Sequence, residues 1–299
     1  MTLSLLRAPL MAAAATALSL AATGAQAANW SDTSIGYRFG TSFQEPFNGK
    51  DIKKNIFNFN HVSGYNYGSN FFNVDFLMSD STDAAGFGST NGAQEAYVVY
   101  RHTLDMAKIT GMNLSFGPIK TINATVGFDW NTKTDVGYNS KKRMLVAGPT
   151  FAINIPAGFL NVGLYQLWES NAPFNTNTDP NCACFGITPR YHYDAHPMLN
   201  LVWGIPLGKE TGFSFEGFAN FITSKGKQEA GRDTAAETNI DMQIMYDASS
   251  FIGAKPKTFK VGIEYQYWKN KFGNKLDSNG AAIPGTFAKT PMLRVQYHF

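Results

Sequence analysis

The side chains that could support hydrolytic chemistry are dispersed through this sequence. A hydrolase of the serine type needs a nucleophile, a histidine within hydrogen-bond reach and an orienting acid. We recognise no catalytic arrangement of nucleophile and acid around any of the five histidines, which are His61, His102, His192, His196 and His298. We therefore expect no catalytic residues and predict that the protein is not an enzyme.

Two imidazoles and a carboxylate alternate along one short segment as His192, Asp194 and His196. On a strand these residues project from one face, and together they form a possible set of metal ligands. However, the distance from i to i+4 along a strand is about 13 Å, too far for one tetrahedral ion unless the strand bulges. We therefore expect neither a metal site nor a cofactor.

The two cysteines, Cys182 and Cys184, are separated by a single residue. A disulfide between them would close a strained ring. We interpret them as loop thiols or scavengers of metal ions rather than as a structural crosslink.

The stretch that organises the chain is its last ten residues, in which apolar and polar side chains alternate. The apolar members are Leu293, Val295, Tyr297 and Phe299, and the polar members between them are Arg294, Gln296 and His298. A period of two indicates a strand with one face in an apolar medium and the other face in polar surroundings. A last strand that ends on phenylalanine is typical of bacterial outer-membrane barrels, in which it must pair with the first strand, because an open edge in lipid leaves backbone groups unpaired.

Twelve segments of strand character, separated by turn residues, follow the N-terminal region. They span 33–43, 55–62, 71–79, 95–102, 121–130, 143–155, 159–169, 190–205, 212–223, 239–247, 258–269 and 290–299. The links after the second, sixth and eighth segments are short, whereas those after the third, fifth, seventh, ninth and eleventh are longer and polar. Because outer-membrane barrels have short periplasmic turns and longer external loops, we predict an all-β fold, a transmembrane antiparallel β-barrel of about 12 strands closed by pairing of the first and last strands.

One link does not follow this alternation of lengths. It joins His102 to Lys120 and lies on the side where short turns are expected. A short helical turn and a plug-like excursion both remain open for it.

The composition agrees with a barrel in lipid. Aromatic residues make up 14% of the chain, glycine occurs 28 times, and charged residues reach only 16%, yet the mean hydropathy is slightly negative at -0.20. Strands that alternate between lipid and a polar lumen produce this combination. The net charge of +3 is too small to indicate a nucleic-acid partner.

The first 27 residues have the pattern of a secretory signal peptide. Arg7 supplies the positive charge, an alanine- and leucine-rich stretch follows, and Ala25-Gln26-Ala27 fits the small-x-small cleavage pattern. We therefore predict a signal peptide over residues 1–27 and one barrel domain over residues 28–299. An exported soluble β-sandwich or propeller is the alternative, but the terminal phenylalanine, the aromatic content and the loop asymmetry favour the barrel.

The alternation also predicts which side chains face the lumen. Charged side chains on the lipid face would cost about 2–4 kcal/mol near the midplane for Arg or Lys, so the charged phase should point inward. The candidate solute-binding residues are Arg38, Asp75, Arg101, Glu216, Phe218, Asp241, Glu264, Trp268 and Arg294, with Asp129, Lys260 and His298 in the same phase. Phe218 and Trp268 offer ring faces for stacking and the acids offer hydrogen-bond acceptors. The alternative is that these charges pair across the lumen and keep it hydrated.

A second set of aromatic residues is expected to face lipid or to belong to the girdles at the membrane interfaces. It comprises Phe43, Phe57, Phe59, Phe72, Phe76, Phe151, Phe213, Phe215, Phe221, Tyr265 and Tyr297.

The stretch Leu114-Ser115-Phe116-Gly117-Pro118-Ile119-Lys120 resembles the L-S-F-G-P-x-K motif of the nucleoside-specific channel-forming outer-membrane proteins, the Tsx-like family. Trp30 just after the signal, the chain length and the aromatic C-terminus also suit that family. The resemblance implies a monomeric twelve-stranded barrel in the outer membrane that passes nucleosides by facilitated diffusion. The segment 121–127 lacks the aromatic residues expected after the motif, and no substrate-contacting position of the family is transferred to this chain.

We thus expect a bacterial outer-membrane channel for nucleosides or similar small solutes, surrounded by outer-membrane lipid. A channel for another small hydrophilic solute remains an alternative. So does a barrel enzyme, or an adhesion or phage-receptor protein that uses its outer loops.

Overall fold

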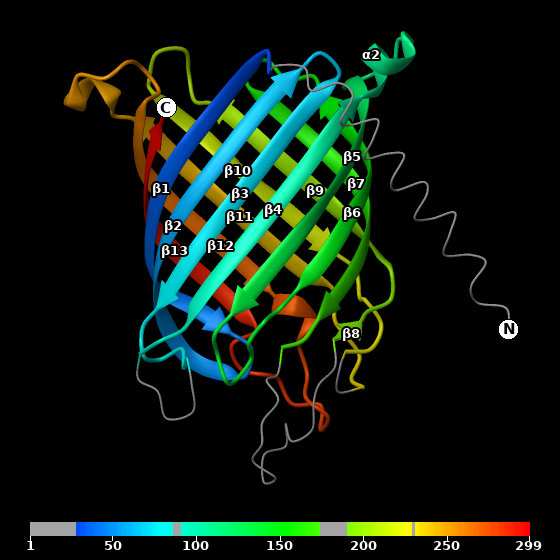
Figure 1. Ribbon diagram of the computed structural model, residues 1–299, viewed down its shortest axis with the longest axis vertical. Helices are drawn as coiled ribbons and strands as arrows, with labels where there is room; N and C mark the ends of the chain where they lie inside the picture. Colours follow the sequence, from blue (N-terminus) through cyan, green and yellow to red (C-terminus); the bar gives the residue numbers. More distant parts are fainter. Residues whose placement is uncertain (1–27, 86–90, 174–189, 229–230) are drawn as a thin grey trace, which may run out of the picture.

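The computed structural model describes residues 28–85, 91–173, 190–228 and 231–299. The predicted signal peptide and both cysteines lie outside these ranges. Most of the described chain is antiparallel β-sheet (Figure 1). The strands are β1 (Trp30–Glu45), β2 (Asn48–Tyr65), β3 (Gly68–Ser79), β4 (Gln94–Asp105), β5 (Ile119–Lys133), β6 (Arg143–Ile153), β7 (Phe159–Asn171), β8 (Tyr191–His192), β9 (His196–Pro206), β10 (Phe213–Ile222), β11 (Glu237–Asp247), β12 (Phe259–Lys269) and β13 (Phe287–His298).

Twelve of these strands form a closed barrel, and the dipeptide β8 pairs with the end of β7 at one rim. Each barrel strand pairs with its neighbour in sequence, β7 pairs with β9, and β1 pairs with β13. The pairing of the first and last strands confirms the closure predicted from the terminal segment. Within the described ranges no helix is long and apolar enough to cross a membrane.

The register confirms the period-two alternation around most of the wall. Residues that face each other across neighbouring strands share a side of the sheet, and the apolar phase points outward. Leu145, Ile263 and Leu293 are each at least 60% exposed on that outer face, where lipid covers them. The lumen contains two apolar clusters as well as polar groups. One comprises Met144, Val146, Tyr165, Leu167, Met198 and Ile222, and the other comprises Phe43, Ile52, Ile56 and Met292.

Phe43 corrects one sequence-based expectation, because it is only 3% exposed and packs inside the barrel. The pairing of β1 with β2 shifts in register between Gly40 and Phe43. Such a β-bulge adds a residue to one strand, so the side chains beyond it point to the opposite face of the sheet. The other ten residues of the predicted aromatic set lie in the outward-facing register.

The two ends of the barrel differ in the way predicted from link lengths. The C-terminus and α2 (Met106–Thr110) lie at one end, and the longer links gather at the opposite end (Figure 1). We take the second end as extracellular, as in other barrels of this class. The stretch from His102 to Lys120 contains a short helical turn, α2, which has no buried residue and lies at the periplasmic end.

The last extracellular link folds closely onto the rim. The Phe47 amide donates to the Pro284 carbonyl at 2.9 Å, which holds the last long link against the β1–β2 turn. Gly285 in this link has φ +70°, and a Cβ there would overlap the Glu45 carbonyl oxygen. Only glycine fits this approach without strain, so the link is seated against the barrel wall.

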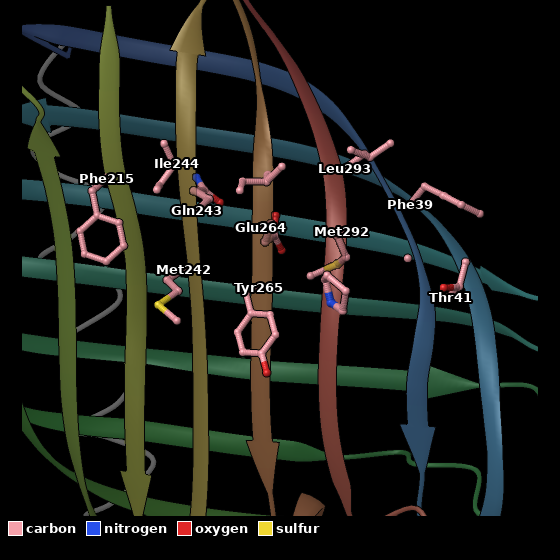
Figure 2. Close-up of a pocket in the computed structure, with 13 residues that line it drawn as sticks. Phe39, Thr41, Phe215, Met242, Gln243, Ile244, Glu264, Tyr265, Met292 and Leu293 are labelled. Carbon is pink, nitrogen blue, oxygen red and sulfur yellow. The ribbon is translucent and has the colours of Figure 1, made fainter. Parts of the chain in front are cut away.

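A hollow of about 480 Å³ on the wall over β10–β13 and β1 is lined mostly by lipid-facing side chains. Figure 2 shows Phe215, Met242, Ile244, Tyr265 and Leu293 on these adjacent strands. Its apolar lining suits contact with acyl chains and offers no chemistry of its own.

Candidate solute pathway in the barrel lumen

All nine residues predicted to contact solute belong to the inward-facing register. Asp75 is paired with Asn58 and Tyr97, Phe218 with Val202 and Asp241, and Arg294 with Arg38 and Gly262. Asp129, Lys260 and His298 share this phase. The period-two reading therefore placed these side chains on the correct face, whereas solute binding by them stays a prediction.

The closing seam of the barrel contains a chain of ion pairs. Arg38 and Arg294 face each other across β1 and β13. Glu264 on β12 accepts from both, with Nη1 of Arg38 at 2.9 Å and Nη1 of Arg294 at 2.5 Å, and Asp75 lies 2.5 Å from Nη2 of Arg38. The Glu264 side chain is 0% exposed. An unpaired charge so deeply buried would be costly, so these four residues stabilise the seam as a unit.

Two further pairs line other parts of the wall. Arg101 on β4 lies 2.7 Å from Asp129 on β5, and the Tyr97 hydroxyl donates to the same carboxylate at 2.9 Å. On the opposite side of the barrel, Lys260 lies 3.1 Å from Glu216. Asp129 and Glu216 are thus each paired with a base on the inner wall, as in the alternative in which lumen charges neutralise one another.

Exposure separates residues that a solute could reach from those that hold the wall together. The Glu216 side chain is 24% exposed, and those of Asp75, Arg101 and Lys260 are 18–19% exposed. Phe218 lies in the same inner register as Glu216. We identify these five as the accessible wall of the lumen, whereas Glu264 is covered.

Trp268 lies on the inner face, but its ring is already occupied. Its indole N–H donates to Glu237 at 2.5 Å, the Lys271 ammonium lies 4.5 Å from the ring centroid, and Phe272 packs edge-on at 5.1 Å. Both ring neighbours come from the last extracellular link. Trp268 therefore anchors this link in the present conformation and offers no open surface for stacking.

An extensive ionic network at the extracellular end was not found by sequence reasoning. We call it the outer ionic cluster, and it comprises Glu45, Lys54, Asp83, Glu95, Lys133, Asp135 and Lys271. Glu45 lies 2.5 Å from Lys54, 3.1 Å from Lys271 and 3.8 Å from Lys133. The side chains of the cluster are at most 10% exposed. It joins four strands to three extracellular links, so it closes this part of the mouth.

Asp83 and Asp135, both in extracellular links, carry opposite pKa shifts. Burial and a hydrogen bond with Asp83 raise the pKa of Asp135 to about 6. Burial also acts on Asp83, but the charges of Lys54 and Lys133 outweigh it and hold the pKa of Asp83 below its ordinary value. Below about pH 6 the protonated Asp135 carboxyl can therefore donate to an ionised Asp83.

A second buried group lies on the other side of the mouth. Lys225 lies 2.7 Å from Glu169 and 4.2 Å from the centroid of the Tyr193 ring. Nε2 of His196 lies 3.8 Å from the same Glu169, and its Nδ1 is 2.8 Å from the Asp194 carbonyl oxygen.

The three residues considered as metal ligands do not converge. His196 is 1% exposed inside the barrel, whereas His192 is exposed on β8. Asp194 lies between them in the segment that joins the two strands, and its carboxylate lies against Gly226.

The outer ionic cluster left little signal in the sequence. Lys133 and Asp83 are 50 positions apart, and Asp83 and Asp135 lie in links whose path no periodicity determines. A usable signal was the placement of Lys54 and Lys133 in otherwise strand-like stretches at the ends facing long links.

Comparison with known proteins supports the fold. No protein-family model matches the chain, and no curated protein matches it. Among solved structures it is similar to an outer membrane channel from Pseudomonas putida F1, with 13% identity over 92% of this chain and 97% of that chain and a TM-score of 0.50. It also resembles the NanC porin, with 10% identity over 90% and 99% of the two chains and a TM-score of 0.42. The translocator domain of the autotransporter NalP from Neisseria meningitidis gives 12% identity over 98% and 96% and a TM-score of 0.39.

These likenesses are at the level of the fold. The closed sheet, the apolar outer wall and the likeness to the Pseudomonas putida channel define the protein as an antiparallel β-barrel of the outer-membrane type. The resemblance of residues 114–120 to the nucleoside channels has no counterpart among the family comparisons and stays a prediction.

Proposed function

We propose that the protein is an outer-membrane channel through which small, uncharged polar solutes diffuse, and that nucleosides are the preferred class. The observation that supports this proposal is the pairing of opposite charges along the accessible wall, at Arg101–Asp129 and Lys260–Glu216. Because each charge has a partner, the wall attracts neither cations nor anions strongly. It can still exchange hydrogen bonds with neutral solutes.

Uncharged polar groups lie in the same inner wall. The hydroxyls of Thr103, Thr125, Thr150 and Tyr165 form a ladder across β4 to β7 with successive distances of 3.0, 2.7 and 2.6 Å. Thr125, Thr150 and Tyr165 are at most 7% exposed, so their hydroxyls satisfy one another within the wall, and only the partly exposed Thr103 can exchange a hydrogen bond with a solute.

The preference for nucleosides depends on the resemblance at residues 114–120 and on Phe218. Phe218 supplies a ring in the accessible wall, with Glu216 two residues away on the same face. A base could stack on the ring while a ribose hydroxyl donates to the carboxylate. Transport by this route needs weak, successive contacts rather than tight binding.

The test is the conductance of the refolded protein in a planar bilayer while adenosine, thymidine or a hexose is titrated. We expect a small conductance that falls saturably with the nucleosides and less with the hexose. Phe218→Ala should weaken block by nucleosides about tenfold, in line with 1–3 kcal/mol for stacking of one base. Phe221→Ala on the outer face is the matched control and should leave the block unchanged. A conductance insensitive to both nucleosides would overturn the nucleoside preference, and a protein that never conducts would overturn the channel.

A further inference from the structure

The outer wall has two contrasting rows of side chains at the extracellular ends of β5 to β8. The rim row runs directly across neighbouring strands, from Trp130 to Arg143, Ser170 and His192. The second row lies two residues further into the membrane along each strand and contains Phe128, Leu145 and Trp168. The wall thus changes from basic and polar to apolar within one pleat.

A hollow of about 590 Å³ connects the two rows. Its lining includes the outward side chains of both rows, among them Trp168 and Leu145, which are 48% and 61% exposed. Tryptophan side chains concentrate at the level of lipid headgroups. The hollow therefore spans the boundary between headgroups and acyl chains.

Two positively charged groups meet at the rim of this hollow. Nη1 of Arg190 donates to the Lys141 carbonyl oxygen at 2.7 Å and to the Ser170 hydroxyl oxygen at 3.2 Å, which places its guanidinium beside the rim row. Burial, followed by the nearby charge of Arg143, holds the pKa of Arg190 below its ordinary value. Within the described ranges, no acidic side chain forms an ion pair with either arginine. Two neighbouring guanidinium groups without a carboxylate form a site for an anion.

We propose that this surface binds a phosphorylated glycolipid of the outer leaflet. A phosphate would lie between Arg143 and Arg190, with His192 nearby, and an acyl chain would occupy the hollow over Phe128, Leu145 and Trp168. Lipid is the occupant that the geometry favours, because the basic row lies on the membrane-facing wall at the extracellular end and continues directly into an apolar surface. Lipid binding on this outer wall does not depend on what passes through the lumen.

The test uses the refolded full barrel in detergent and native mass spectrometry. The probes are lipid A bearing two phosphates and the same lipid after enzymatic removal of its phosphates. We expect one tightly held copy of the phosphorylated lipid and about tenfold weaker binding after Arg143→Gln or Arg190→Gln, because each removes charge-assisted hydrogen bonds to phosphate. The matched control is Lys53→Gln. Lys53 is an exposed basic residue of β2 at the extracellular end of the barrel, and this variant should bind lipid as the unaltered chain does.

Three other results would overturn the proposal. The first is equal binding of the phosphorylated and dephosphorylated lipids. The second is competition by millimolar inorganic phosphate that displaces the lipid completely, which would indicate a site for a free anion. The third is a dimer that dissociates in the Arg143→Gln variant, which would show that a second barrel covers this wall. Retention of the folded, heat-modifiable form on electrophoresis checks that each variant is intact. A Leu145→Ser variant, which alters only the apolar row, should weaken lipid binding while leaving the phosphate contacts in place.

Discussion

If the barrel conducts as proposed, the outer ionic cluster should control whether its mouth is open, and Glu45 is the residue that tests this. Its carboxylate is 3% exposed and lies within 4 Å of three lysines, of which Lys271 belongs to the last extracellular link. Glu45→Gln retains the shape of the side chain and removes its charge. Burial already holds the pKa of Lys271 below its ordinary value, so this ammonium would lose its main compensation.

The expected magnitude follows from the cost of leaving a buried charge without its partner. Removing one member of a buried ion pair costs about 3–5 kcal/mol. This cost destabilises the closed conformation alone, because Lys271 is hydrated when the last extracellular link opens. Since 1.4 kcal/mol corresponds to a factor of ten, the lower bound shifts the equilibrium roughly a hundredfold toward the open state.

Single-channel recording in a planar bilayer measures this equilibrium as the ratio of open to closed time. We expect Glu45→Gln to raise this ratio roughly a hundredfold. Glu210→Gln serves as the control, because Glu210 is exposed in the β9–β10 turn at the periplasmic end. A Glu45→Gln variant that folds normally and gates like the unaltered protein would refute control of the mouth by this cluster.

Three further predictions concern the mouth, the wall and the seam. As the pH rises through about 6, Asp135 loses the proton that it shares with Asp83. Repulsion between the two carboxylates should then loosen the closure of the mouth, although Lys133 lies 3.2 Å from Asp135. Bilayer conductance should therefore be higher at pH 7 than at pH 5 in the unaltered protein and insensitive to pH in Asp135→Asn. Leu293→Arg places a charge on the lipid face and should lower the free energy of unfolding from vesicles, measured in urea, by about 2–4 kcal/mol. The control is Leu276→Arg in an extracellular link, and a loss for Leu293→Arg no larger than that of the control would contradict the assigned membrane face. Glu264→Gln leaves the buried Arg38 and the partly buried Arg294 short of a partner and should cost about 3–5 kcal/mol in the same assay. An unchanged unfolding midpoint would show that the seam does not depend on this acid.

The sequence was sufficient for the architecture because a barrel in lipid permits few alternatives. Every backbone group must be paired and every second side chain must suit hydrocarbon. The inward positions of Arg38, Glu216 and Arg294 followed from this alternation alone. Phe43 was assigned to the wrong face because a local register shift leaves no compositional mark.

The contacts among inward residues could not be predicted in the same way. The alternation gives the face of a residue but not its height or its partner, so Glu264 and Glu216 looked equivalent although only Glu216 is accessible. Trp268 looked like a stacking surface because the link that carries Lys271 has no periodicity to show that it folds back onto the ring. The outer ionic cluster depends on links of this kind and is a tertiary property.

The acid at the seam also bears on the order in which the barrel is assembled. β12 and β13 are consecutive strands, so Glu264 can pair with Arg294 before the ends of the chain meet. Arg38 arrives with β1, directly opposite a guanidinium of like charge. The carboxylate already in place offsets the repulsion between them and accepts the second arginine as the ladder closes. The C-terminal hairpin thus carries the negative charge that compensates Arg38 on the N-terminal strand. The ion pair between Arg38 and Glu264 can therefore fix the register of β1 against β13 at the final step of barrel assembly.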